Sequence, residues 1–78
     1  MIFLIEYDRP LGRLITFRSF EASNRQEAAK ARLELELSRN SQDLDREIVL
    51  LEASSEAALR ETHRRYFQNA RQIIESST

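Results

Sequence analysis

The hydrophobic and polar positions along the chain begin with two short apolar runs separated by a turn. Residues 2–7 are almost continuously apolar and rich in isoleucine and aromatics, which is typical of a strand covered on both faces. In residues 8–13, Pro10 and Gly12 favour a turn, so residues 14–20 are predicted to return as the second strand of a hairpin. Strand alternation places Ile15 and Phe17 on one face of this second strand and Leu14, Thr16, Arg18 and Phe20 on the other.

The next segment is dense in strong helix formers and predicts a helix over about residues 25–39. Asn24, followed by Glu27, indicates its N-cap. Residues 33–37 alternate leucine with glutamate and could instead form a strand. Both residue types lack the β-branching that strands favour, and a helix ending at Arg32 would have only about two turns. We therefore assign residues 33–37 to the helix.

A third strand and a second helix are predicted after a polar loop at residues 40–46. The apolar run at residues 47–53 favours another buried strand. Ser54 and Ser55 are adjacent N-cap candidates for a helix from residue 56 to about residue 75. The resulting order is strand, strand, helix, strand, helix.

This order predicts an α+β fold with two layers, formed by a single domain over residues 1–78. A right-handed crossover through the first helix makes the third strand parallel to the second, so the apolar first strand fits between them in the order 2-1-3. Both helices are then expected on one face of the three-stranded sheet. A chain of 78 residues has a thin core, and without cysteine it has no disulfide to support it, which favours self-association.

Apolar side chains occupy both faces of the predicted strands, which is more than a two-layer fold can cover. In the first strand, Phe3 and Ile5 point opposite Ile2 and Leu4. The first helix has two apolar stripes roughly 120° or more apart, one formed by Ala29, Leu33 and Leu37 and the other by Ala28, Ala31 and Leu35. One stripe can meet the sheet, and the other must meet the second helix or another chain. We therefore predict a homodimer or another protein partner.

The charge balance and the start of the chain predict a cytoplasmic protein without a membrane partner. Twelve Lys and Arg residues against thirteen Asp and Glu residues give a net charge of −1, so the whole molecule has no field that would attract nucleic acid or an anionic membrane. The first apolar run is too short for a membrane span and lacks the basic flank of a signal peptide.

The segment HRRYF, residues 63–67, contains the best candidate for a binding site. On a helix that continues to about residue 75, His63 falls on the apolar face with Leu59 and Tyr66, where a neutral core histidine is common. Arginines form a ridge beside an aromatic ring on the same helix, a pattern that can grip phosphate and stack a base. The candidate binding residues are Arg60, His63, Arg64, Phe67 and Arg71. Acidic residues lie within helical reach of these arginines, which is also the pattern of a self-paired solvent face.

No residue pattern in the chain predicts catalysis, a metal site or a cofactor. One histidine and no cysteine are available to bind a metal, and a single glycine cannot form a phosphate-binding loop. We predict a small non-catalytic protein–protein interaction or accessory module that acts as a homodimer. The alternative is a nucleic-acid-binding protein that uses the arginine and aromatic residues of the second helix.

Overall fold

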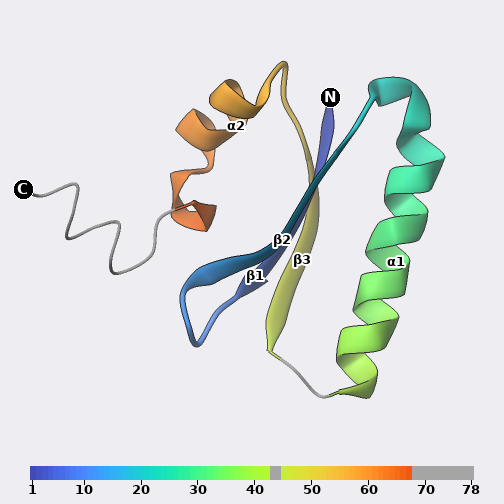
Figure 1. Cartoon of the computed structure of the whole chain (residues 1–78), viewed down its shortest axis with the longest axis vertical. Helices are drawn as coiled ribbons and strands as arrows, with labels where there is room; N and C mark the ends of the chain where they lie inside the picture. The colour runs from blue at the N-terminus through green and yellow to red at the C-terminus, as the bar shows by residue number, and fades with distance from the viewer. Residues whose placement is uncertain (43–44, 68–78) are drawn as a thin grey trace, which may run out of the picture.

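The computed structural model describes residues 1–42 and 45–67, and these form three strands, two α-helices and two short 3-10 turns (Figure 1). The strands are β1 (Ile2–Asp8), β2 (Arg13–Phe20) and β3 (Arg46–Glu52). The helices are α1 (Arg25–Ser41) and α2 (Glu56–Thr62), and the 3-10 turns are η1 (Ala22–Asn24) and η2 (Arg64–Tyr66). The predicted α+β class and the order β-β-α-β-α are confirmed.

The three strands form one antiparallel sheet in the predicted order, β2-β1-β3. β1 is antiparallel to both neighbours, so that Leu4, for example, faces Arg18 on one side and Leu50 on the other. The run from Ile2 to Glu6 is buried, because β1 has a strand on each side and a helix over each face. The central position that its continuous apolar pattern predicts is therefore confirmed.

The two helices lie on opposite faces of the sheet, whereas the sequence led us to expect them on one face (Figure 1). Arg39 of α1 binds Glu6, whose side chain projects from one face of β1. Leu59 of α2 packs against Phe3 and Ile5, which project from the other face. Because β1 carries large apolar groups on both faces, one helix per face removes both sets from water, at about 1.5–3 kcal/mol for each fully buried side chain. The molecule therefore has three layers, α1, sheet and α2.

The first helix is continuous through residues 33–37 and ends two residues beyond the predicted position. Ala28 and Ala31 are buried against the sheet, and Leu35 is half-buried beside them. Small alanine side chains allow the helix to lie close to the strands. Asn24 precedes the helix as predicted, but its side chain makes no capping hydrogen bond.

The hairpin between β1 and β2 has the predicted turn, followed by a bulge that alternation did not predict. Gly12 has the positive φ of 64° that the turn requires. The register shifts after Glu6, because Tyr7 pairs with Leu14 while Glu6 pairs with Thr16, so Ile15 is the extra residue. The bulge turns Leu14 to the same face as Phe17, where both pack against the core. The predicted division of β2 into two faces is therefore wrong before the bulge.

The second helix has the predicted N-cap but ends much earlier than residue 75. The Ser55 hydroxyl accepts a hydrogen bond of 3.1 Å from the Ala58 amide. The helix ends at Thr62, whose hydroxyl donates to carbonyl oxygens of the preceding turn, and His63 then leaves the helical conformation with φ −126° and ψ 52°. η2 follows and places Tyr66 in the core. The rest of the predicted helix, from residue 68, lies outside the described residues.

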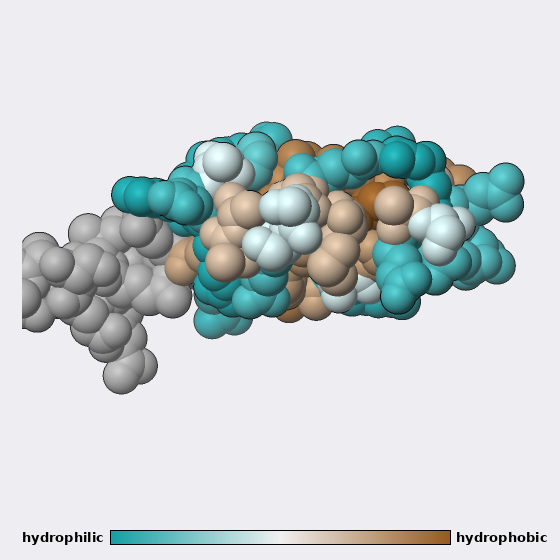
Figure 2. All heavy atoms as spheres, turned by 90° about the horizontal axis from the view of Figure 1, so that it is seen from above, coloured by the Kyte–Doolittle hydropathy of each residue, from teal (hydrophilic) through white to brown (hydrophobic). Residues whose placement is uncertain are grey.

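Aromatic rings join the strands to η2 on the α2 face. The Phe3 and Phe17 rings are stacked with centroids 5.6 Å apart, and Phe17 also meets Phe67 edge-on at 5.5 Å. Tyr7 meets Tyr66 edge-on at 5.5 Å. Seen from the end of the molecule that holds the N-terminus, apolar residues gather over the middle, between hydrophilic residues at either side (Figure 2). In the described part of the chain, none of the helices has the length and apolar character needed to cross a bilayer.

Candidate functional site

Four of the five predicted binding residues lie at the end of α2 and in the turn that follows it. Arg60 is in α2, His63 ends that helix, Arg64 begins η2, and Phe67 directly follows η2. Arg71 lies outside the described residues. The continuous helix on which the predicted arginine ridge depended therefore ends before Arg64.

Arg60 and Phe67 are brought together, and both are already engaged within the chain. The Arg60 guanidinium lies over the Phe67 ring, 4.5 Å from its centroid. Its Nε also donates a 3.0 Å hydrogen bond to Glu56. An edge contact with Phe17 covers another side of the Phe67 ring. This pair therefore closes the end of the aromatic core.

His63 is a helix terminus rather than a member of a polar cluster. Its backbone amide donates 2.9 Å to the Leu59 carbonyl and so completes the last turn of α2. The half-buried ring lies 6.3 Å from the Tyr66 ring, centroid to centroid. Arg64, the next residue, is exposed.

A cluster around Glu47 joins η2 to the sheet, and no residue pattern in the sequence predicted it. Glu47, in β3, accepts hydrogen bonds from the Tyr66 hydroxyl and from Arg65 at 2.6 Å, and Arg9 lies 3.5 Å away. The Arg65 guanidinium also lies 4.2 Å from the centroid of the Tyr66 ring. Partial burial alone would raise the pKa of Glu47, but the bonds from Tyr66 and Arg65 hold it below its ordinary value. Burial and the bond to Glu47 raise the pKa of Tyr66.

A second cluster, around the fully buried Glu6, joins α1 to the other face of the sheet. Its carboxylate accepts hydrogen bonds from Arg39 at 2.5 Å, from Arg46 at 2.6 Å and from Thr16 at 2.6 Å. Arg46 also pairs with Asp8 at 3.2 Å. Burial alone would raise the pKa of Glu6, and these donors lower it below the ordinary value. Since donors surround both Glu6 and Glu47, the two carboxylates serve to fasten helix and turn to the sheet.

The outer face of α1 carries an apolar stripe, the outer stripe, formed by Ala29, Leu33 and Leu37. Leu33 is 54% exposed and Leu37 is 62% exposed. These residues lie on the side of the helix opposite Ala28 and Ala31, which are buried against the sheet. The sheet separates this face from α2, so α2 cannot cover the stripe. This is the part of the predicted surplus apolar surface that lies on the helix. The surplus that was also predicted on the sheet is absent from the described residues, because α2 covers the face of Phe3 and Ile5.

Opposite charges border the outer stripe on each flank. Lys30 and Glu34 lie on the flank toward β2, where they line a shallow groove with Arg18. Arg32 and Glu36 lie on the other flank, 3.5 Å apart, and Glu36 lines a groove beside β3. Each flank therefore holds one base and one acid, four residues apart.

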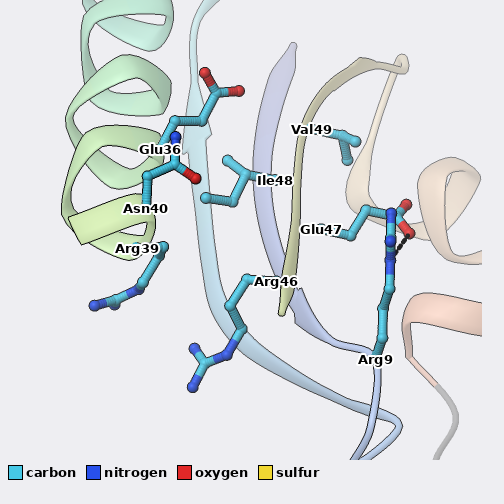
Figure 3. Close-up of a pocket in the computed structure, with 8 residues that line it drawn as sticks. All are labelled: Arg9, Glu36, Arg39, Asn40, Arg46, Glu47, Ile48 and Val49. Carbon is cyan, nitrogen blue, oxygen red and sulfur yellow. Dashed lines mark ion pairs between the residues drawn. The ribbon is translucent and has the colours of Figure 1, made fainter. Parts of the chain in front are cut away.

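Among the described residues, 1–42 and 45–67, no strand pairs with the outer edge of β3, which lies beside a groove of about 570 Å³. In Figure 3, Arg46 and Ile48 project from the α1 side of β3, while Glu47 and Val49 project from the other side. The groove is lined by Arg9, Glu36, Arg39, Asn40, Arg46, Glu47, Ile48 and Val49. Arg9 pairs with Glu47 within the groove, while Arg39 and Arg46 pair with Glu6 of β1, so the groove presents a mixed polar wall around an apolar strand.

Comparison with known proteins adds no family to these observations. The chain matches no known protein family, no curated protein and no solved structure.

Proposed function

We propose that this chain is a small non-catalytic interaction module of the cytoplasm that works as a homodimer, with the outer stripe of α1 as the contact. The observation that supports it most is the exposure of Leu33 and Leu37 on a helix face that the described chain does not cover. Contiguous apolar surface on a soluble protein commonly marks a contact with another chain.

A second copy is the partner that fits the charges beside the stripe. When two α1 helices pair antiparallel about a two-fold axis near Leu33, each flank faces the same flank of the other copy. Lys30 then lies beside Glu34 of the second copy, and Arg32 lies beside its Glu36. All four facing contacts join opposite charges, which sets the orientation of the pair.

A parallel pair of α1 helices would be less favourable. Each flank would then face the opposite flank, so that Lys30 meets Arg32 and Glu34 meets Glu36 of the second copy. Contacts between like charges are destabilising. The flanks therefore select the antiparallel arrangement.

The size of the stripe indicates a reversible dimer. If each copy buries on the order of 300 Å² of apolar surface, the pair gains on the order of 15 kcal/mol before association costs of about 4–15 kcal/mol. The margin is small, and it suits a contact that forms and dissociates as concentration changes.

Sedimentation equilibrium with two matched variants tests this proposal. At about 100 μM, well above a micromolar dissociation constant, we expect Leu33→Glu to halve the weight-average mass of the wild type. Leu11→Glu is the control, because Leu11 is a similarly exposed leucine (61%) in the hairpin turn, and its change should leave the mass unaltered. A wild type that sediments as a monomer, or a mass that Leu33→Glu leaves unchanged, contradicts the proposal.

The nucleic-acid alternative has less support from the contacts of its residues. The face of Phe67 that a base would stack on is occupied by Arg60, and Arg60 is paired with Glu56. Arg64 is exposed, and it stands apart from the predicted ridge because the helix ends before it. We therefore favour a protein partner.

A further inference from the structure

We infer that the open edge of β3 pairs with β3 of another copy, joining two three-stranded sheets into one of six strands. This inference extends the proposed self-association to a second surface. Three observations support it. Backbone amides and carbonyls of β3 point away from β1, and the middle of β3 has no bulge, proline or charge that would block pairing. Two copies of β3 also match each other in one antiparallel register.

The backbone groups of Ile48 and Leu50 point toward the open edge. Met1 and Ala53 exchange two hydrogen bonds, of 2.9 and 3.1 Å, so they form a hydrogen-bonded pair between β1 and β3. Such pairs alternate with non-bonded pairs along an antiparallel ladder. Leu51 and Val49 therefore direct their amides and carbonyls to β1, while Leu50 and Ile48 direct theirs outward.

The middle of β3 lacks the devices that keep an edge strand from pairing. The four residues from Ile48 to Leu51 are all apolar, with no proline and no register shift against β1. The other edge, β2, has a bulge at Ile15 and carries Arg13 and Arg18. Bulges and charges are common means of blocking an exposed edge, so β2 is protected, whereas the charged residues of β3, Arg46, Glu47 and Glu52, lie at its two ends and leave its middle without such protection.

β3 is complementary to itself when two copies pair antiparallel about Val49. In that register Ile48 faces Leu50 of the other copy. The outward amide of each residue can then donate to the outward carbonyl of the other, as in a hydrogen-bonded pair of an antiparallel sheet. Arg46 faces Glu52 of the other copy at both ends of the joint. A shift of one residue would turn the side chains to the wrong faces, and a shift of two would separate Arg46 from Glu52.

The groove beside β3 can receive the partner strand. In this register the residues that enter it are Val49 to Glu52 of the other copy, which places apolar side chains beside Ile48 and Val49. The incoming Glu52 then lies near Arg46, which keeps guanidinium donors beyond those bound to Glu6 and Asp8.

The strand contact and the helix contact use separate surfaces. The outer stripe points away from the sheet, whereas the β3 edge lies in the plane of the sheet, so their two-fold axes are at right angles. Arg25 of α1 reaches Glu52 at one end of β3, and Arg39 reaches Glu6, which faces Ile48 toward the other end. Leu33 is therefore roughly level with the middle of β3, so the two perpendicular two-fold axes meet. Together the two contacts generate a closed assembly of four copies.

Amide hydrogen exchange measured by NMR reports directly on whether the outward amides of β3 are hydrogen-bonded to another copy. Between about 10 μM and about 1 mM, we expect exchange at Ile48 and Leu50 to slow by at least about tenfold as the edges pair. Phe17 and Ser19, whose amides point outward from the β2 edge by the same alternation, are internal controls and should not change. Fast exchange at Ile48 and Leu50 at every concentration overturns the inference.

Variants on the two edges give an independent measure. Ile48→Pro removes an outward amide from β3 and should halve the weight-average mass, whereas Ser19→Pro removes one from β2 and should not. If circular dichroism shows that Ile48→Pro does not fold, Glu52→Arg is used instead. This change places an arginine opposite Arg46 of the other copy where the two β3 strands pair. Arg25→Ala is its control, since it breaks the same pair within the chain and leaves the edge intact. Masses that neither edge variant lowers contradict the inference.

These results separate the inference from the proposed function. If Leu33→Glu halves the mass while Ile48 and Leu50 exchange quickly, the helix contact stands and the strand contact is wrong. If the amides are protected while Leu33→Glu leaves the mass unchanged, the strand contact stands and the helix contact is wrong. The double variant Leu33→Glu, Ile48→Pro should be a monomer.

Discussion

Arg39, near the end of α1, donates a 2.5 Å hydrogen bond to Glu6 in the middle of β1, and this contact fastens the helix to the sheet. Glu6 is fully buried, while the Arg39 side chain remains 24% exposed at the rim. A buried carboxylate is costly unless donors surround it, so the position of α1 and the charge of Glu6 depend on each other. The same contact turns the outer stripe of α1 away from the sheet.

Loss of Arg39 should destabilise the fold. Arg39→Met keeps much of the aliphatic stem and leaves Glu6 with Arg46 and Thr16, so we expect the free energy of unfolding in urea to fall by about 2 kcal/mol. Arg32→Met, which removes only exposed pairs, with Glu36 of its own chain and with Glu36 of the second copy in the proposed dimer, is the matched control and should cost less than about 1 kcal/mol at the same protein concentration. Equal effects of the two variants would show that the buried contact is not special.

The free energy of unfolding should decrease in acid, because the carboxylates of Glu6 and Glu47 accept hydrogen bonds in the folded chain. The pKa values of Glu6 and Glu47 are lower in the folded chain than their ordinary value of 4.5, so the unfolded chain binds more protons in acid. Their contribution to the free energy of unfolding is complete above pH 4.5 and is lost as the pH falls through the folded-state pKa values. Urea unfolding at a fixed protein concentration should show a shallower decline for Glu6→Gln than for the wild type. Parallel curves would be inconsistent with this linkage.

The Tyr66 hydroxyl should contribute to stability through Glu47. Tyr66→Phe keeps the ring in the core and removes a donor to a charged acceptor, so we expect a loss of about 1.5–3 kcal/mol in urea unfolding. Tyr7→Phe removes a hydroxyl from the neighbouring ring without altering Glu47 and serves as the control. If Tyr66→Phe is as stable as Tyr7→Phe, then Arg65 and Arg9 alone satisfy the Glu47 carboxylate.

Nucleic-acid binding should be absent or insensitive to the predicted residues. We expect fluorescence anisotropy at low salt to detect no binding of mixed single- and double-stranded probes, because the Arg60 and Phe67 pair is engaged within the chain. A salt-dependent affinity that falls when Arg60 and Arg64 are both changed to Glu would restore the alternative function.

Local patterns predicted the elements of this fold well. The apolar run of β1, the turn with Gly12 and the helix through residues 33–37 follow from strand alternation and helix propensity, which neighbouring residues determine. The order 2-1-3 follows from the crossover rule and the apolar character of β1. The outer stripe was also visible in the sequence, because its spacing is that of one helix face.

Long-range contacts determined what the sequence pattern missed. Periodicity continues past Thr62, but the helix ends there, and η2 places Tyr66 beside Glu47, 19 residues earlier in the chain. The sheet face on which α2 packs depends on which apolar side chains α1 leaves exposed, and this is a property of the whole sheet. The Glu6 and Arg39 contact spans 33 residues, and in the sequence both look like ordinary surface charges.

Disulfide trapping at Leu33 tests the central claim, that a second copy covers the outer stripe of α1. The chain has no cysteine, so Leu33→Cys introduces a single thiol. On a two-fold axis near Leu33 the two thiols face each other, and mild oxidation should convert most of the protein to a covalent dimer on non-reducing electrophoresis. Leu11→Cys, at a position in the hairpin that is slightly more exposed than Leu33, should stay largely monomeric under the same conditions. Equal and slow cross-linking of the two variants would contradict the claim that α1 is the dimer contact.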